Sequence, residues 1–357
     1  MEITNRRMAL QRLGGAMVMP WAASVASADA AKHRVKVGQI GVGHAHASKL
    51  SVYRDSSEYE VVGVVEPDEQ LRKQASTQPV YQGLTWMTQE QLLNTPGLEL
   101  VLVETRVRDL LNVAEVCVAA GKNIHLDKPA GDSLPQFQRL LDEAAKKQLL
   151  VQMGYMYRYN PAIVLMREFL KQGWLGEPFE VHTVMSKAVN SEKRHKLADS
   201  PGGMMFELGC HIIDLTLGVL GKPDKVTPYP RRVLESDDKL VDNMLAVFEY
   251  PRATATVRSS ALEIEGFARR HFVVCGTEGT FHVQPLDNPR ARVALSKQRG
   301  KYTQGYQDIT FPKYTRYVDD AADIARVIRG EKSADFSYEH DLAVQTAVLE
   351  ASDLTTK

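Results

Sequence analysis

The chain contains little cysteine and has no excess of charge of either sign. Its three cysteines, Cys117, Cys210 and Cys275, lie far apart, without the spacing of a zinc site or a disulfide framework. It has 44 basic and 44 acidic side chains, so the composition gives no indication of a nucleic-acid-binding surface. The 357 residues, 44% of them hydrophobic, are typical of a globular protein with two domains.

The N-terminus has the pattern of a cleaved export signal. Paired arginines at 6–7 precede a weakly apolar stretch at 8–25, and an Ala-Ser-Ala sequence follows at 26–28. The arginine pair resembles the twin-arginine type of signal, which directs proteins across the bacterial inner membrane. The stretch is too polar for a transmembrane helix, which needs about 20 mostly apolar residues. We therefore predict that 1–30 is an export signal and that the mature protein is periplasmic or secreted, without a membrane anchor. The alternative is a basic N-terminal helix in a cytoplasmic protein.

Strands alternate with helices over the first half of the chain. Apolar runs predict strands at 34–42, 59–65, 98–103, 123–126 and 149–154. The segments between and after them predict helices at 45–54, 70–78, 109–120 and 134–147. This alternation is typical of βαβ units around a mostly parallel sheet. We therefore predict a Rossmann domain over 31–152.

The pattern changes after this region. Helices are predicted at 160–172, 204–220, 317–329 and 341–352. Strands are predicted at 179–185, 240–249, 253–263, 270–275 and 280–284. Consecutive strands with few helices between them favour a large, open, mostly antiparallel sheet. The predicted fold is therefore α/β, with an α+β domain over 153–357 after the Rossmann domain.

A glycine-rich turn follows the first predicted strand. Gly41 permits the tight turn, and Gly43 lets the backbone approach a pyrophosphate at the helix N-terminus. His46 stands where a third glycine is usual. Glu66 ends the second strand about 20 residues further on, as expected of an acid that binds the ribose hydroxyls. Because its charge would repel a 2′-phosphate, we predict NAD as the cofactor rather than NADP.

His44 and His46 have the spacing of a metal-binding pair, but we predict no metal here. A turn that faces a pyrophosphate is a poor site for a cation, and no carboxylate or cysteine lies adjacent in the sequence. Both histidines are instead expected to contact cofactor or substrate from the start of the helix.

Lys128 lies in the tripeptide Asp127-Lys128-Pro129, directly after the predicted strand at 123–126. Open α/β sheets bind their ligands at the carboxyl ends of the strands. The sequence therefore places an ammonium group beside the bound ligand. Such a tripeptide is by itself an ordinary turn, and the glycine-rich turn upstream favours the functional interpretation.

Two carboxylates flank a histidine on the predicted helix at 204–220. Glu207 is four residues before His211, and Asp214 is three residues after it, so the three share one helix face. A carboxylate on this face can orient the imidazole, whose ordinary pKa of about 6.5 suits it to accept a proton at neutral pH. The alternative is a structural histidine beside a surface ion pair.

Together these motifs resemble those of the Gfo/Idh/MocA family, which includes glucose–fructose oxidoreductase and inositol dehydrogenase. The resemblance extends roughly from Val35 to Ser352. It rests on the glycine-rich turn, the acid-Lys-Pro tripeptide, Tyr157 to Pro161, Gly202 to Asp214, Asp242, and Gly276 to Thr280.

The resemblance implies hydride transfer between NAD and a sugar, polyol or sugar derivative. It implies that His211 is the base, that Lys128 stabilises the reacting oxygen beside the nicotinamide, and that Glu207 orients His211. The predicted substrate contacts are Tyr155, Tyr157, Arg158 and Asp214. The expected partners are a small carbohydrate and, through the second sheet, other copies of the chain.

Two other functions are compatible with these residues. A redox-assisted glycosidase or lyase would use the same Lys128 and His211, with Tyr155, Tyr157 or Tyr159 as an acid, and would restore its cofactor in every turnover. Export favours such a closed cycle, because the periplasm supplies no pool of nicotinamide cofactor. A non-catalytic protein that binds NAD or a sugar is the second alternative. The joint presence of Lys128, Glu207 and His211 argues against it.

Overall fold

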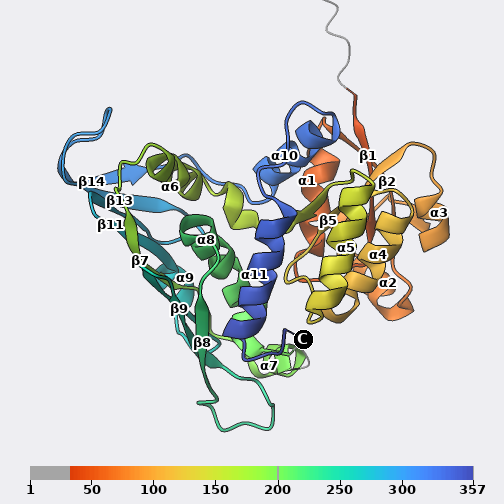
Figure 1. Ribbon diagram of the computed structural model, residues 1–357. Helices are drawn as coiled ribbons and strands as arrows, with labels where there is room; N and C mark the ends of the chain where they lie inside the picture. Colours follow the sequence, from red (N-terminus) through yellow and green to blue (C-terminus); the bar gives the residue numbers. More distant parts are fainter. Residues whose placement is uncertain (1–32, 199–200, 357) are drawn as a thin grey trace, which may run out of the picture. The chain divides into compact units, whose positions relative to one another are not determined.

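The computed structural model describes residues 33–198 and 201–356, so the predicted export signal lies outside the described residues (Figure 1). The described chain forms two β-sheets with helices packed against them. Among these residues, no helix is both long and apolar enough to span a membrane.

The first sheet has six parallel strands in the order β3-β2-β1-β4-β5-β6. Its strands are β1 (Val35–Ile40), β2 (Tyr59–Val65), β3 (Trp86–Met87), β4 (Leu98–Val103), β5 (Asn123–Leu126) and β6 (Val151–Met153). This is the strand order of a dinucleotide-binding fold, and it confirms the predicted Rossmann sheet. Only β3 was not predicted, because two residues are too few to show a periodic pattern.

Helices cover both faces of this sheet (Figure 1). One face packs against α3 (Gln89–Leu93), α4 (Leu110–Ala119) and α5 (Leu134–Lys146). The other face packs against α1 (Leu50–Asp55), α2 (Glu69–Ser76) and α10 (Val318–Ile328). Strand β4 is apolar throughout because both of its faces are buried. Val101 and Val103 pack into one core, and Leu100 and Leu102 pack into the other. Helix α10, from the end of the chain, thus completes the core of the N-terminal sheet.

The second sheet has eight strands in the order β14-β13-β12-β11-β7-β10-β9-β8. They are β7 (Pro178–Val184), β8 (Lys225–Arg231), β9 (Asn243–Glu249), β10 (Thr254–Ser260), β11 (His271–Gly276), β12 (Gly279–Val283), β13 (Arg290–Leu295) and β14 (Gly305–Thr310). Only the β7–β10 pair is parallel, which confirms the predicted mostly antiparallel sheet. Strands β8, β13 and β14 were not predicted. Strand β8 contains Pro228 and Pro230, which are tolerated here since β8 lies at the edge of the sheet.

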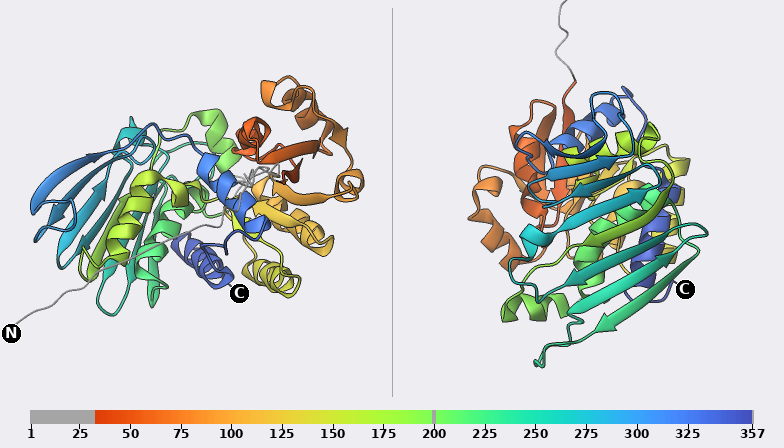
Figure 2. Two further views of the ribbon diagram at one scale, coloured as in Figure 1. Left: turned by 90° about the horizontal axis from the view of Figure 1, so that it is seen from above. Right: turned by 90° about the vertical axis from the view of Figure 1, so that its left-hand side faces the viewer.

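Helices α6 (Pro161–Lys171) and α8 (Cys210–Leu220) pack on one face of this sheet. The opposite face is turned toward the viewer in the right-hand view of Figure 2. Helix α11 (Tyr338–Ala351) packs against both α8 and α5 and so connects the cores of the two sheets. The short helices α7 (Ser191–Ala198) and α9 (Gly266–Arg269) follow β7 and β10.

The helix predicted at 204–220 is divided in two. Residues Met205–Gly209 form a π-helical turn, η5, and the regular helix α8 begins only at Cys210. Before the turn, Gly203 has a φ of 57°, and a Cβ there would lie 2.5 Å from the Val241 carbonyl oxygen. Any other residue would displace this turn from the segment before β9. A π-turn at this place changes which side chains share a helix face.

Phe169 is expected to contribute strongly to stability. Its buried ring lies 4.9 Å from Trp174, 5.1 Å from Phe281 and 4.7 Å from Tyr302, measured between centroids, and it attaches α6 to the second sheet. We expect Phe169→Ala to lower the free energy of unfolding by about 3–5 kcal/mol, because it leaves a cavity among packed rings. Phe179→Ala, at an exposed position of β7, should change it by about 0.5 kcal/mol or less. Chemical denaturation measures both, and equal losses would contradict this account of the core.

Candidate active site

The candidate site lies at the carboxyl ends of β1, β4 and β5, where the second half of the chain reaches the first sheet. The Lys128 Nζ donates a hydrogen bond to the Glu207 backbone oxygen at 2.7 Å, so the tripeptide after β5 contacts η5 directly. The Lys128–Pro129 peptide bond is cis. The ring of His46, in the turn after β1, lies 6.0 Å from the ring of His211, at the start of α8. The structure therefore brings Lys128, His46 and His211 into one site.

A buried group of charges lies beneath this site. The ammonium of Lys49 is 2.8 Å from a carboxylate oxygen of Glu104 and 2.8 Å from one of Asp127, and all three side chains are fully buried. Burial alone would lower the pKa of Lys49, but Asp127 and Glu104 together raise it. Burial and the charge of Asp127 raise the pKa of Glu104. Asp127 itself is held well below its usual pKa, against the effect of burial, by His44, Lys49 and His46.

Both histidines of the turn contact Asp127. The His44 Nδ1 lies 3.1 Å from Asp127 Oδ2, and its Nε2 hydrogen-bonds the Lys128 backbone oxygen at 3.1 Å. The His46 Nδ1 lies 3.2 Å from Asp127 Oδ1. Burial lowers the pKa of His46 to about 4 despite the nearby carboxylate. His46 is therefore a neutral imidazole at pH 7, with Nδ1 placed to donate to Asp127.

In the fold, a carboxylate that is distant in the sequence lies beside the two histidines of this turn. Asp127 is adjacent to both His44 and His46, and the three offer ligand atoms within 4.8 Å of one another. The Lys49 ammonium, however, already lies 2.8 Å from the carboxylate that a cation would use. A divalent ion there would face this buried positive charge at close range, which opposes its binding.

The predicted contact between Glu207 and His211 is not found. No hydrogen bond or ion pair joins them among the described residues, and the buried Nδ1 of His211 has no hydrogen-bond partner there. Glu207 lies in the π-turn at 205–209, whereas His211 lies in the regular helix α8, so the two are not on one continuous α-helix as the spacing assumed. Glu207 is half-buried and reaches the site mainly through its backbone oxygen.

Electrostatics make His211 neutral at physiological pH. Its side chain is almost fully buried, and burial, reinforced by Lys128 and His46, lowers its pKa well below the ordinary value. A neutral imidazole is ready to accept a proton, and the positive charge of Lys128 makes the same site favourable for a developing negative charge.

The predicted substrate contacts Arg158 and Asp214 are engaged in buried ion pairs. The Arg158 guanidinium is buried and pairs with Asp214 at 2.5 Å and with Asp341 at 2.6 Å. His340 also approaches Asp214, at 3.3 Å. Burial would raise the pKa of Asp214, but the charge of Arg158 lowers it. These residues tie α8 and α11 to the segment before α6, which favours a structural role over the predicted contact with substrate.

The two predicted tyrosines both lie beside His211. The Tyr157 ring is 5.1 Å from the His211 ring, and its hydroxyl donates to Asp287 at 2.6 Å. The Tyr155 ring is 6.1 Å away, and its buried hydroxyl has no partner among the described residues. Tyr157 is thus fixed by Asp287, whereas the Tyr155 hydroxyl and the His211 Nδ1 are buried without a hydrogen-bond partner among the described residues.

The turn after β1 fits a dinucleotide. Gly41 has a φ of 92°, and a Cβ there would lie 2.5 Å from the Thr105 nitrogen, so the chain passes close to the loop after β4. The Glu66 carboxylate accepts hydrogen bonds from the backbone nitrogens of Val42, at 2.9 Å, and Asp68, at 3.0 Å. The predicted acid therefore lies beside the predicted glycine turn, at the position where a ribose would bind.

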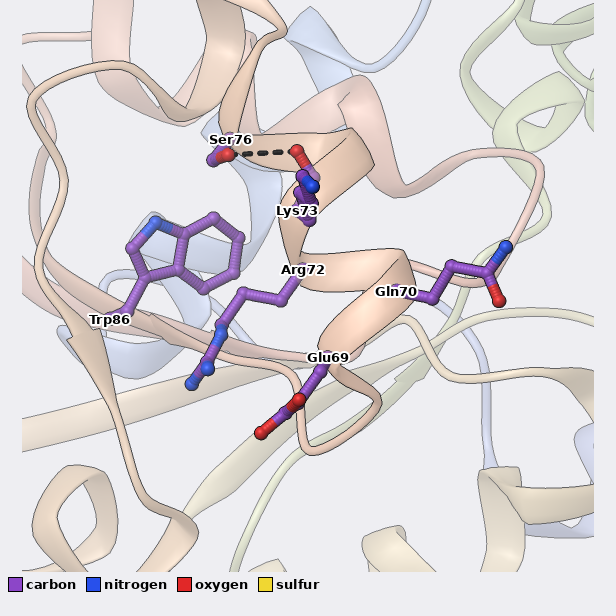
Figure 3. A pocket seen from close by; sticks show the side chains of 6 residues that line it. All are labelled: Glu69, Gln70, Arg72, Lys73, Ser76 and Trp86. Carbon is purple, nitrogen blue, oxygen red and sulfur yellow. Dashed lines mark hydrogen bonds between the residues drawn. The ribbon is translucent and has the colours of Figure 1, made fainter.

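A groove of about 760 Å³ lies along the helix that follows Glu66 (Figure 3). Arg72 extends beside the ring of Trp86, and the Ser76 hydroxyl donates to the Lys73 backbone oxygen at 2.8 Å. Its lining also includes Glu69 and Gln70. The groove is formed by residues of α2 and β3. In the sheet, β3 is separated by β2, β1 and β4 from β5, which Lys128 follows. The lining residues of the groove do not include the proposed base or the lysine that would stabilise the reacting oxygen.

Several residues of the site were missed in the sequence. Glu104 directly follows the apolar strand β4, and the rule that ligands bind at the carboxyl ends of strands would have found it. Lys49 and Asp287 have no local signal, because they reach their partners Glu104, Asp127 and Tyr157 only through long-range packing.

Comparison with known proteins identifies the family. Residues 35–155 match the oxidoreductase family with an NAD-binding Rossmann fold, and residues 163–282 match the GFO/IDH/MocA C-terminal domain. The two matches cover more than half of the sequence, and the chain belongs to the GFO/IDH/MocA family of oxidoreductases.

Individual relatives differ in how much of the chain they match. The chain is 26% identical over 271 residues to the uncharacterized oxidoreductase YhhX of Escherichia coli K12, covering 75% of this chain and 76% of YhhX. It is 27% identical over 141 residues to scyllo-inositol 2-dehydrogenase (NADP(+)) IolW of Bacillus subtilis 168, covering 39% of each protein. An oxidoreductase from Agrobacterium radiobacter, solved in complex with NAD+, L-tartaric acid and magnesium, is similar with a TM-score of 0.76 at 16% identity. That similarity covers 90% of this chain and 97% of the other, and it concerns the fold.

Removal of the buried ammonium should destabilise the protein. Lys49→Met leaves Glu104 and Asp127 facing each other without a cation, and we expect the free energy of unfolding to fall by about 3–5 kcal/mol at pH 7. Lys146→Met, at an exposed position of α5, should change it by about 0.5 kcal/mol or less. Urea denaturation measures both variants. If Lys49→Met lowers the free energy of unfolding by less than about 1 kcal/mol, these ion pairs are not needed for stability.

Arg158→Met separates a structural role from a substrate contact. We expect it to lower the free energy of unfolding by about 3–5 kcal/mol, because Asp214 and Asp341 remain buried without their cation. The exposed Arg139→Met on α5 is the control. Unchanged stability with a raised KM for substrate would support the predicted contact between Arg158 and substrate.

Proposed function

We propose that this chain is an NAD-dependent oxidoreductase that transfers hydride between the cofactor and a carbinol of a sugar, polyol or sugar derivative. The observation that carries the proposal is the meeting of Lys128 and His211 at the carboxyl edge of the Rossmann sheet. The Lys128 Nζ reaches η5, and its charge lowers the pKa of His211. Family membership and the inositol dehydrogenase activity of the relative IolW support a polyol-type substrate.

Each residue would have a distinct task in the reaction. The neutral His211 accepts the hydroxyl proton, and Lys128 stabilises the negative charge that develops on the same oxygen. The turn after β1 and Glu66 would hold NAD, which would supply the hydride acceptor for oxidation of the carbinol to a carbonyl. The rings of His46 and Tyr155 both lie beside the ring of His211. These two side chains would position the reacting group. Glu207 would act by presenting its backbone oxygen to Lys128 rather than by orienting His211.

NAD is proposed in preference to NADP because of Glu66. Its carboxylate is held at the end of β2 by the nitrogens of Val42 and Asp68, where it would bind ribose hydroxyls and repel a 2′-phosphate. IolW is named as an NADP(+) enzyme, so the relatives alone do not decide the cofactor.

A redox-assisted glycosidase or lyase is the second candidate. It is supported by the buried Tyr155 hydroxyl, which has no partner among the described residues although its ring faces His211. Burial raises the pKa of Tyr155 well above its ordinary value, so it would remain a proton donor. The export pattern of the N-terminus also favours a cycle that restores the cofactor.

The state of the cofactor in freshly purified, undialysed protein distinguishes these candidates. We expect extraction to yield NAD(H), with NADP(H) absent. Retention of stoichiometric NAD(H) through gel filtration would support a closed cycle, and the next screen would use pairs of sugars and glycosides. Empty protein that binds NAD reversibly would support an ordinary dehydrogenase. Protein that binds no nicotinamide nucleotide would contradict both.

Lys128→Met tests the proposed chemistry. We expect kcat to fall by about 10²–10³-fold, because a preorganised charge at the reacting oxygen is lost. Lys146→Met should leave kcat unchanged. The measurement is absorbance of NADH at saturating substrate, with bound NAD determined in parallel. A Lys128→Met enzyme with full activity and full NAD content would exclude the proposed role and would favour a non-catalytic function for this residue.

A further inference from the structure

Arg106 lies over the glycine-rich turn that would receive the cofactor. It belongs to the loop after β4, which passes so close to the turn that a Cβ on Gly41 would lie 2.5 Å from the Thr105 nitrogen. A Cβ on Gly43 would lie 3.1 Å from the Arg106 Cγ. Gly43 is the residue at which the backbone is expected to approach a pyrophosphate. The side chain of Arg106 therefore borders the space that a pyrophosphate would enter.

The guanidinium of Arg106 reaches across the turn to the loop after β2. Its Nη2 lies 3.3 Å from the Asp68 Oδ2. Asp68 is itself fixed, because its Oδ1 accepts hydrogen bonds from two backbone nitrogens in the first turn of α2 and its own nitrogen donates to Glu66. In the sheet, β2 and β4 lie on either side of β1. The ion pair thus joins the loops that flank the glycine-rich turn.

A dinucleotide that binds as proposed has to pass this ion pair. Its ribose would lie at Glu66, after β2, and its nicotinamide would lie near Lys128, after β5. The strands between these two are β1 and β4, which the glycine-rich turn and Arg106 follow. The pyrophosphate joins the two halves of the molecule, so it would lie between Glu66 and Lys128, beside Arg106.

Arg106 is better suited to bind this pyrophosphate than the other basic side chains of the turn. Lys49 is fully buried and pairs with two carboxylates. His46 is neutral at pH 7, since burial lowers its pKa to about 4. The helical segment after the turn is short, with three residues of 3₁₀ helix and six of α1, so few peptide dipoles are aligned toward a ligand. The Arg106 side chain, in contrast, is charged and 46% exposed.

We propose that Arg106 binds the pyrophosphate of the dinucleotide and exchanges Asp68 for it when the cofactor binds. The pair with Asp68 is exposed, and such pairs contribute little to stability, so it opens readily. A guanidinium forms two parallel hydrogen bonds with a phosphate, and these charge-assisted bonds are stronger than neutral ones. Asp68 holds the guanidinium over the turn and competes with the cofactor for it. The proposal rests on the proposed NAD site and assigns the side chain that neutralises its phosphate charge.

The test measures nucleotide binding by calorimetry with full-length protein from which bound nucleotide has been removed. The two probes are ADP-ribose, which contains the pyrophosphate but no nicotinamide, and adenosine, which contains no phosphate. We expect Arg106→Gln to weaken ADP-ribose binding by about 10- to 100-fold, as for the loss of a hydrogen bond to a charged group, and to leave adenosine binding unchanged. Arg108→Gln, at an exposed position of the same loop, is the matched control and should keep the native affinity for both probes.

Asp68→Asn tests the exchange of partners, because it should act in the opposite direction. Asparagine preserves the cap of α2 but releases the guanidinium, so ADP-ribose should bind about 2- to 5-fold more tightly, as expected from the loss of an exposed ion pair that competes with it. In the double variant Arg106→Gln/Asp68→Asn this gain should disappear, since no guanidinium remains to be released.

Several outcomes would overturn the proposal. Native affinity of Arg106→Gln for ADP-ribose would show that the ion pair has no part in binding. Equal losses for ADP-ribose and adenosine would place the guanidinium on the adenosine instead. A gain from Asp68→Asn that persists in the double variant, or no gain at all, would refute the exchange.

The proposed reaction fails separately from this proposal, because ADP-ribose cannot accept hydride. Protein that binds ADP-ribose through Arg106 but oxidises no sugar or polyol would refute the proposed chemistry and support the pyrophosphate contact. Protein that binds neither NAD nor ADP-ribose would refute both.

Discussion

The site depends on a fully buried lysine held between two carboxylates. Lys49 pairs with Glu104, at the end of β4, and with Asp127, at the end of β5. A charge so deep in the protein is tolerated only when it is paired, so this arrangement fixes the ends of two strands and the first helical turn relative to one another. Asp127 is also the carboxylate that both His44 and His46 contact. The glycine-rich turn, the tripeptide with Lys128 and the site histidines are therefore positioned by one group of charges.

This constraint explains why the turn can lack its third glycine. In the usual motif, that glycine allows the helix to pack closely on the strand. Here residues 47–49 form a short 3₁₀ turn before α1, and the His46 ring contacts Asp127 and faces His211. The side chain at this position thus contributes to the site instead of being excluded from it. The backbone oxygen of Lys128 is hydrogen-bonded to His44, and the Lys128 ammonium donates a hydrogen bond to the backbone of η5.

Much of the fold, and part of the site, could be predicted from the sequence. Alternating strands and helices predict the parallel sheet, and the rule for carboxyl ends places Gly41, Glu66 and Lys128 at one edge of it. Edge strands such as β8, with its two prolines, are not recognisable from periodicity. The role of Glu207 was inferred from α-helical spacing to His211, but Glu207 lies in the π-turn at 205–209. Asp214 keeps its helical spacing to His211 in α8 and is instead paired with Arg158. Arg158 was expected to contact substrate, but it pairs with Asp341, which is 183 residues away in the sequence. No local sequence pattern predicts a pairing between residues so far apart.

The same long-range packing produces two zones of different electrostatic character. Beneath the turn, Lys49, Glu104, Asp127 and the two histidines form a group in which charges are closely paired. Near His211, burial comes first among the causes that lower its pKa, and the charges of Lys128 and Arg270 lower it further. A base with such a depressed pKa is weak in isolation, so proton removal depends on stabilising the oxygen anion that forms. In the proposed reaction, the charge of Lys128 would supply that stabilisation at the reacting oxygen, and the paired group beneath the turn would hold the tripeptide of Lys128 in place. The neutral base and the stabilised oxygen anion would thus be two consequences of one unequal distribution of charge.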